Sequence, residues 1–175
     1  MVKCTRIVAA TCLTLLAAGG TKLEAQSRPQ FGPQLSFGSN DLGVGIGARV
    51  VLDVATIIPT ARNFGFIGSF DYFFPQTGLG GPSPTWWELN GNGTYNFAIP
   101  NTKIVPYAGA GLNVAHFGYD INVLGVTGSY SHTDVGLNLL GGAKFGNVGK
   151  VTPFGELRLE LHSGSAVVLT GGVLF

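Results

Sequence analysis

The amino-acid sequence predicts an all-β fold: an eight-stranded antiparallel up-and-down β-barrel of the transmembrane type. Hydrophobicity alternates with a period of two residues along eight segments, which is the period of strands rather than of helices. Charged residues make up only 11% of the 175 residues, against about 25% in an average soluble domain. Short turns and longer loops alternate between most of the segments, as they do in membrane barrels.

A secretory signal peptide is expected ahead of the barrel. Lys3 and Arg6 give a short positive segment, and the apolar stretch 7–18 follows. About twelve apolar residues are too few to span a bilayer, because a transmembrane helix needs about 20. We therefore expect a cleaved signal peptide at 1–25 and an outer-membrane-type barrel domain at 26–175.

The first half of the barrel domain contains four segments with strand periodicity. In chain order they cover residues 31–37, 42–54, 63–74 and 85–97. The fourth shows the alternation most clearly, since Trp87, Leu89 and Tyr95 share an apolar face opposite Glu88 and Asn90. In the second and third segments, aliphatic residues and phenylalanines alternate with glycine and polar residues in the same way. The first is a shorter run of the same kind.

The second half contains four more segments. They cover residues 104–117, 133–145, 151–162 and 167–175. In the sixth, Leu137 and Leu139 oppose Asn138, and in the seventh leucines alternate with glutamate and arginine. The eighth ends in alternating apolar residues. The fifth is the least regular, with Tyr107 and Asn113 on one face.

The links between the segments indicate how the barrel is oriented. Residues 56–62, 99–102 and 146–150 are short turns, whereas 75–84 and 119–132 are longer and rich in Gly, Ser and Thr. An even number of antiparallel strands brings both ends of the barrel to the same side. This arrangement matches membrane barrels, in which short turns are periplasmic and longer loops are extracellular.

Alternation alone does not say which face points inward, because a soluble barrel such as a lipocalin would enclose its apolar face. Here the polar face consists mostly of Asn, Thr, Ser and Gly, which suits a crowded interior better than a surface in contact with water. Aromatic residues lie on the apolar face near strand ends, where membrane barrels carry interfacial girdles. The expected girdle residues are Trp87, Tyr95, Phe97, Tyr72 and Phe74.

Charged residues of the polar face would then be enclosed in the lumen. An unpaired charge in a dry interior is costly, so we expect these residues to pair with one another. The expected network consists of Arg49, Asp71, Glu88, Lys144, Glu156, Arg158 and Glu160. A turn centred on Val148 would set Asn138 opposite Arg158 and Asp134 opposite His162. Such a network would close the lumen to solutes, and a gated or narrow porin-like channel is the alternative.

Three stretches carry a resemblance to a known family. They are VPYAGAG at 105–111, PFGELR at 153–158 and GGVLF at 171–175. With them the chain resembles the outer-membrane β-barrel domain family, which includes OmpA-like, OmpX-like and opacity-protein barrels. The resemblance implies location in the outer membrane of a Gram-negative-type bacterium, with outer-membrane lipid around a monomeric barrel. It also implies that Phe175 is part of the signal read by the barrel-assembly machinery.

One enzymatic alternative stays open, because one small-barrel family deacylates lipid A with a His-x-Ser pair and a carboxylate near the outer rim. Here Ser163 directly follows His162, which places its hydroxyl on the opposite face unless Ser165 swings back. Asp134 could orient His162 as a base is oriented in hydrolytic triads. Since the spacing departs from the family pattern, we expect no catalysis.

Other functions find little support in the sequence. Residues 43–48 match the dinucleotide pattern G-x-G-x-x-A, but no helix follows them. His116, His132 and His162 lack metal-ligand spacing, so neither a cofactor nor a metal is expected. From residue 26 onward there are seven basic and eight acidic residues without a basic stripe, which excludes nucleic acid as a partner. A structural or surface-interaction role remains.

Overall fold

The computed structural model describes most of the expected barrel domain. The described residues are 28–75, 84–123, 126–146, 150–162 and 164–175. The expected signal peptide, 1–25, and most of the expected loop 75–84 lie outside them. Within these ranges, no helix is long and apolar enough to cross a membrane.

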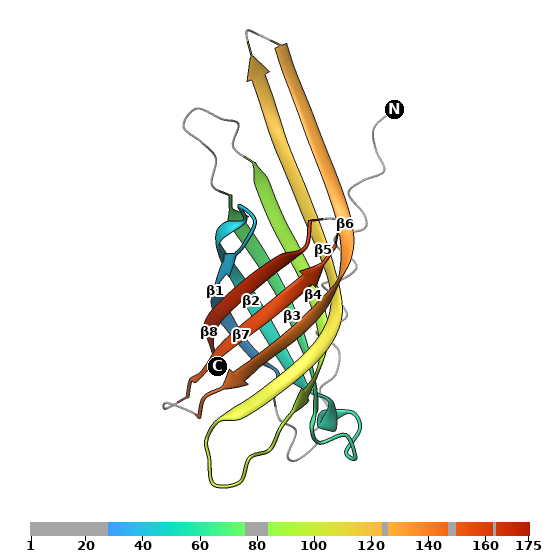
Figure 1. Ribbon diagram of the computed structural model, residues 1–175. Coiled ribbons are helices and arrows are strands. Elements are labelled where there is room, and N and C mark those ends of the chain that lie inside the picture. Colours follow the sequence, from blue (N-terminus) through green and yellow to red (C-terminus); the bar gives the residue numbers. More distant parts are fainter. Residues whose placement is uncertain (1–27, 76–83, 124–125, 147–149, 163) are drawn as a thin grey trace.

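The described residues form eight strands, which join in sequence order into one closed antiparallel barrel (Figure 1). The strands are β1 (Gln30–Gly38), β2 (Gly43–Asp53), β3 (Phe64–Phe74), β4 (Thr85–Asn96), β5 (Val105–Val123), β6 (Val126–Lys144), β7 (Thr152–Leu161) and β8 (Ala166–Leu174). A short 3-10 helix, η1 (Val54–Thr56), follows β2. Because β8 pairs with β1, the sheet is closed, and the predicted all-β up-and-down barrel is confirmed.

The barrel has two ends that differ in their connections. We call the end that carries the β2–β3, β4–β5 and β6–β7 links the turn end, and the opposite end the hairpin end. β1 begins and β8 finishes at the turn end. There the backbone nitrogen of Phe175 donates to the carbonyl oxygen of Phe31 at 2.8 Å, so the β1–β8 seam continues to the last residue of the chain.

The two faces of the strands have opposite surroundings. Outward side chains are apolar and exposed: Leu137 is 56% exposed and Leu169 55%. Inward side chains in the middle of the barrel are polar and buried, with Arg158 and Glu160 both at 0% exposure. The apolar face therefore points away from the barrel axis, as the sequence indicates and opposite to a soluble barrel.

The inward face is not polar throughout, which the sequence analysis missed. An apolar cluster fills the turn end: Val51, Ile67, Tyr107, Leu140, Phe154 and Leu174. A second cluster fills the hairpin end: Leu42, Phe73, Ala166 and Val168, with Trp86 packed against it. Leu42 was expected on the outer face, but it is only 2% exposed. It precedes β2 in a turn where Asp41 and Gly43 have positive φ, so the alternation of β2 does not extend back to it.

The expectation of a loop at 119–132 is wrong, because the chain continues there as β-strand. β5 runs to Val123 and β6 begins at Val126, so the pair forms a hairpin that projects well beyond the barrel wall (Figure 1). The Ser, Thr and Gly content suggested a loop, but tyrosines that pair across the two strands favour a ribbon. Tyr119 and Tyr130 lie opposite each other with ring centroids 5.4 Å apart.

The expected register between β6 and β7 is also wrong, by two residues. Asn138 pairs with Glu160 rather than with Arg158. The Cβ atom of His162 lies beside Gly136 rather than opposite Asp134. The physical reason is a longer turn, since Phe145 donates its backbone N–H to Pro153 instead of pairing nearer to Val148.

A test of the inner packing uses two glycines on neighbouring strands. A Cβ atom at Gly111, on the inner face of β5, would lie 2.1 Å from the carbonyl oxygen of Gly91, whereas at Gly93, on the outer face of β4, the nearest atom would be 3.9 Å away. Gly111→Ala is expected to lower the free energy of unfolding by about 1–3 kcal/mol because backbone must shift. Gly93→Ala is the matched control and should change it little. Urea unfolding in detergent micelles measures both, and equal effects would contradict the close approach.

Candidate functional site

The centre of the barrel holds a buried ion pair between β2 and β7. Arg49 donates from Nη1 and Nη2 to the two carboxylate oxygens of Glu156 at 2.9 and 2.7 Å, and both side chains are 1% exposed. Tyr107 donates its hydroxyl to the same carboxylate at 2.9 Å. Gln34 accepts a hydrogen bond from Arg49 Nε, and the guanidinium lies 4.2 Å from the centroid of the Phe154 ring. This bidentate geometry is the strong form of a charge-assisted hydrogen bond.

A second arginine, Arg158 on β7, links carboxylates from its own strand and from two others, β3 and β4. Its Nε atom lies 2.7 Å from Glu160 Oε1, and its Nη2 atom lies 3.4 Å from Asp71 and 3.5 Å from Glu88. Arg158 Nη1 is also 3.8 Å from Glu156, which joins this group to the Arg49 pair. Two guanidinium groups are therefore enclosed with four carboxylates in one connected cluster.

Polar side chains that the sequence analysis did not assign to the network make further hydrogen bonds to it or beside it. Gln34 and Ser36 from β1 donate to Asp71 Oδ1 at 2.7 and 2.8 Å. On the other side of the interior, Asn138 donates to Asn90 at 2.8 Å and to Asn92 at 3.0 Å. All of these residues lie at the inward-facing positions of their strands. The period-two alternation could therefore have identified them from the sequence.

Six of the seven expected network residues come together in this cluster, and Lys144 does not. Lys144 stands at the turn-end terminus of β6, where it is half-buried and its Nζ atom lies 6.0 Å from the centroid of the Tyr107 ring. The expected membership of Lys144 is therefore wrong. By alternation Lys144 occupies an inward-facing position of β6, but this position is at the rim of the barrel rather than at the level of the two arginines.

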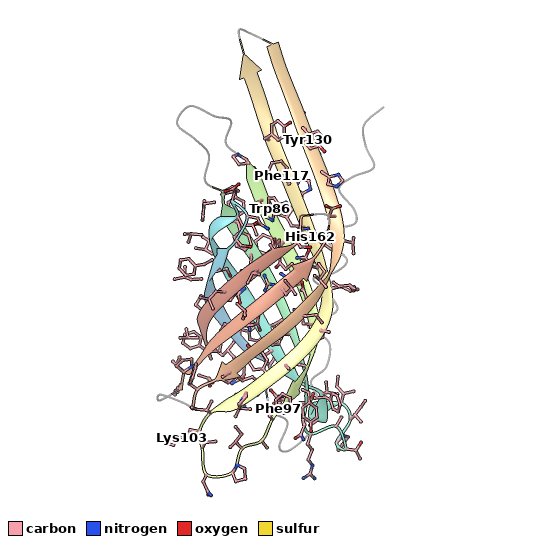
Figure 2. All side chains as sticks on the ribbon, in the orientation of Figure 1. Trp86, Phe97, Lys103, Phe117, Tyr130 and His162 are labelled. Carbon is pink, nitrogen blue, oxygen red and sulfur yellow. The ribbon has the colours of Figure 1, made fainter. Side chains whose placement is uncertain are left out.

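The mouth at the hairpin end contains a cavity of about 330 Å³ below the projecting ribbon. It is lined by Trp86, Ala115, Phe117, Tyr130, His132, Asp134, His162 and Gly164. Aromatic rings follow one another from the barrel up the ribbon: Trp86 contacts Phe117 at 5.3 Å, Phe117 contacts Tyr119 at 5.7 Å, and Tyr119 contacts Tyr130. Figure 2 shows Trp86, Phe117 and Tyr130 at successive heights above His162. We call these four rings the aromatic ladder.

The contacts described for His162, Asp134 and Ser165 differ from those of a catalytic relay. Asp134 Oδ1 lies 2.9 Å from the Nε2 atom of His132 on its own strand. His162 accepts the backbone N–H of Gly164 at Nδ1, and its Nε2 atom faces Glu160 at 3.8 Å. Ser165 donates its hydroxyl to the carbonyl oxygen of His162 rather than to the ring. Ser163 lies outside the described residues.

Outward-facing aromatic residues form two groups at different heights. Near the hairpin end, Tyr72 contacts Phe74 at 5.2 Å, and Trp87 stacks on the His116 ring at 5.0 Å. Near the turn end, Tyr95 contacts Phe97 at 5.1 Å. All five expected girdle residues lie in these two groups. In the described ranges, no group of three or more His, Cys, Asp or Glu side chains is placed to hold a metal ion.

The buried cluster makes a direct stability prediction. Arg158→Gln would leave four carboxylates facing one guanidinium in a dry interior, so the free energy of unfolding should fall by about 3–5 kcal/mol. Lys144→Gln, at the half-buried rim of the same barrel, is the matched control and should cost less than about 1 kcal/mol. Urea unfolding of the detergent-folded protein gives both values, and a near-neutral Arg158→Gln would show that the cluster does not depend on its central cation.

Comparison with known proteins adds solved structures of the same architecture. No family model and no curated protein sequence matches the chain. Neisserial surface protein A (NspA) is similar at 17% identity and TM-score 0.57, covering 83% of this chain and 94% of that one. The N-terminal β-barrel domain of Pseudomonas aeruginosa OprF has 14% identity and TM-score 0.53, with coverage of 83% and 97%. Ail, the attachment invasion locus protein of Yersinia pestis, has 13% identity and TM-score 0.52, with coverage of 84% and 96%. The chain thus shares the fold of small eight-stranded outer-membrane barrels.

Proposed function

We propose that the protein is an integral outer-membrane β-barrel that serves a structural or surface-interaction role without catalysis. The observation that carries the proposal is the inverted distribution of side chains. Leucine, valine and phenylalanine are exposed around the barrel, while arginine and glutamate are enclosed. An apolar outer surface is stable in contact with the hydrocarbon core of a membrane. The membrane core also requires that every backbone N–H and C=O group is hydrogen-bonded, and the β1–β8 seam pairs the two edge strands. The shared fold with outer-membrane barrels supports the same location.

The strand lengths agree with the thickness of a membrane. β7 contains ten residues, which at about 3.3 Å per residue extend about 33 Å. With a tilt of about 40° this covers about 25 Å, the height of the apolar band in outer-membrane barrels. β5 and β6 contain 19 residues each, so their distal parts extend beyond the membrane as a ribbon.

The lumen is proposed to be closed rather than conducting. An eight-stranded barrel leaves an interior only wide enough for side chains, and here Arg49, Arg158 and their carboxylates occupy its middle. Apolar clusters lie on both sides of this layer, at the turn end and at the hairpin end. Solutes would therefore meet three successive layers of packed side chains.

The mouth and the ribbon are the proposed interaction surface. The aromatic ladder presents Tyr119 and Tyr130 on the ribbon, with Tyr130 51% exposed, above a cavity bordered by His132 and Asp134. Aromatic rings supply large contact areas, and the neighbouring polar groups supply directional hydrogen bonds. A closed barrel with a projecting two-stranded ribbon fits a role in presenting this surface to partners outside the cell.

The membrane part of the proposal is tested by placing a charge on the outer face. Leu139→Arg, in the part of β6 that pairs with β7 and opposite Leu159, should lower the free energy of unfolding in phospholipid vesicles by about 2–4 kcal/mol. Ser131→Arg, on the same face of β6 but on the ribbon, is the matched control and should be nearly neutral. Folding is followed by heat-modifiable gel mobility. An unaffected Leu139→Arg protein, or one that folds in buffer without lipid, would contradict a lipid-facing surface.

The closed lumen is tested by planar-bilayer recording. The wild-type protein should show no large, steady conductance, because charged side chains block the middle of the barrel. Arg49→Ala combined with Glu156→Ala removes both partners of the central pair without leaving an unpaired charge, and it should still show no large conductance because the apolar layers at the two ends remain. Lys144→Ala, at the rim, should remain closed. Steady wild-type conductance would favour the narrow-channel alternative.

A further inference from the structure

The charged residues outside the lumen are distributed unequally between the two ends. The turn end carries the exposed cations Arg28, Arg62, Lys103 and Lys150, together with the half-buried Lys144. Asp53 is the one acidic residue at that end within the described ranges. Asp41 and Asp134 lie at the hairpin end, and Asp120 lies in the ribbon. No lysine or arginine of the described chain accompanies them.

Exposed apolar side chains lie at the same turn end as the cations. Ile57 is 79% exposed and Ile58 52%, both in the link that follows η1, and Ile99 is 50% exposed in the β4–β5 turn. Figure 2 shows Phe97 and Lys103 at this end of the molecule. A Cβ atom at Gly146 would lie 2.4 Å from the Cβ atom of Lys103, so the β4–β5 turn packs directly against the β6–β7 turn. Cations and isoleucines thus share the rim at the turn end of the barrel.

We propose that this rim docks on the anionic headgroups of the phospholipids that surround the turn end. The proposal rests on the membrane-spanning function proposed above. Each lysine or arginine near an anionic lipid surface strengthens association about fivefold at physiological ionic strength. Exposed isoleucines beside the cations can enter the boundary between headgroups and acyl chains, which is the arrangement of interfacial anchors.

The apolar residues favour a lipid surface over a soluble or rigid polyanion. A polysaccharide such as peptidoglycan would pair with Arg62 and Lys103 but would leave Ile57 and Ile58 in contact with water. At a membrane interface the cations can lie among the headgroups while the isoleucines lie slightly deeper, next to the acyl chains. The acidic hairpin end, by contrast, would be repelled by anionic headgroups, so the two ends differ in the leaflet that they prefer.

The experiment uses the full barrel refolded into phosphatidylcholine vesicles that contain a trace of spin-labelled lipid. Electron spin resonance gives the relative association of labelled phosphatidylglycerol over labelled phosphatidylcholine at the protein boundary. The wild-type protein should prefer phosphatidylglycerol about fivefold or more, and about 1 M salt should abolish the preference because it screens exposed charges.

Two variants assign the preference to the turn end. The combined variant Arg28→Gln, Arg62→Gln, Lys103→Gln and Lys150→Gln should bind both lipids equally. Lys103→Arg with Lys150→Arg keeps the charges and should keep the preference. Asp41→Asn, at the hairpin end, is the control for a general charge effect and should not reduce it.

Each outcome decides the inference. A wild-type barrel that folds in vesicles, as its gel mobility shows, but has no salt-sensitive lipid preference would overturn the docking proposal and leave the membrane proposal standing. Failure to fold in any vesicle would overturn both. Sedimentation of the detergent-folded protein with purified peptidoglycan, together with equal lipid association, would assign the rim to the polysaccharide instead. The wild-type salt series decides the question even where the fourfold variant does not fold.

Discussion

The narrow interior of a closed eight-stranded barrel is the constraint on which the rest of this structure depends. Closure turns one face of every strand inward, where there is room for side chains but not for bulk water. Any charge on that face must therefore find its partner within the barrel. Arg49 and Arg158 do so with carboxylates from β3, β4 and β7, and the apolar residues have only the outer surface and the two ends of the interior left to occupy.

Residue alternation predicted most of the fold because it reports directly on this constraint. The period of two placed Glu88, Asn90 and Arg158 on inward faces and Leu89 and Leu137 on outward faces, and the structure agrees. It also indicated a shared face for Tyr107 and Asn113 in the least regular strand. Alternation says nothing about height along the barrel axis, however. Lys144 has inward periodicity but lies at the rim, and Phe73 and Val168 are inward yet form an apolar layer.

Features that depend on contacts between strands were harder to predict. The β6–β7 register is set by where Phe145 and Pro153 begin to pair, and no residue in the 146–150 turn specifies that length. The β5–β6 ribbon was mistaken for a loop because its Ser, Thr and Gly content resembles one. Cross-strand neighbours such as Tyr119 and Tyr130 become visible only when the pairing is known. The same holds for the mouth cavity, to which three strands and the β7–β8 link contribute.

The arrangement along the barrel axis suggests what the buried polar groups in the middle of the barrel contribute. Three of the four rings of the aromatic ladder stand on β5 and β6. The inner faces of these two strands also carry Asn113 and Asn138, which both donate to Asn90 inside the barrel. A two-stranded ribbon is at best marginally stable by itself, so its geometry outside the barrel depends on the register held inside it. Buried polar groups that each need a particular partner penalise a slipped register, because a slip would leave them unpaired. The enclosed charges would then contribute to function indirectly, by fixing the strand register from which the interaction surface projects.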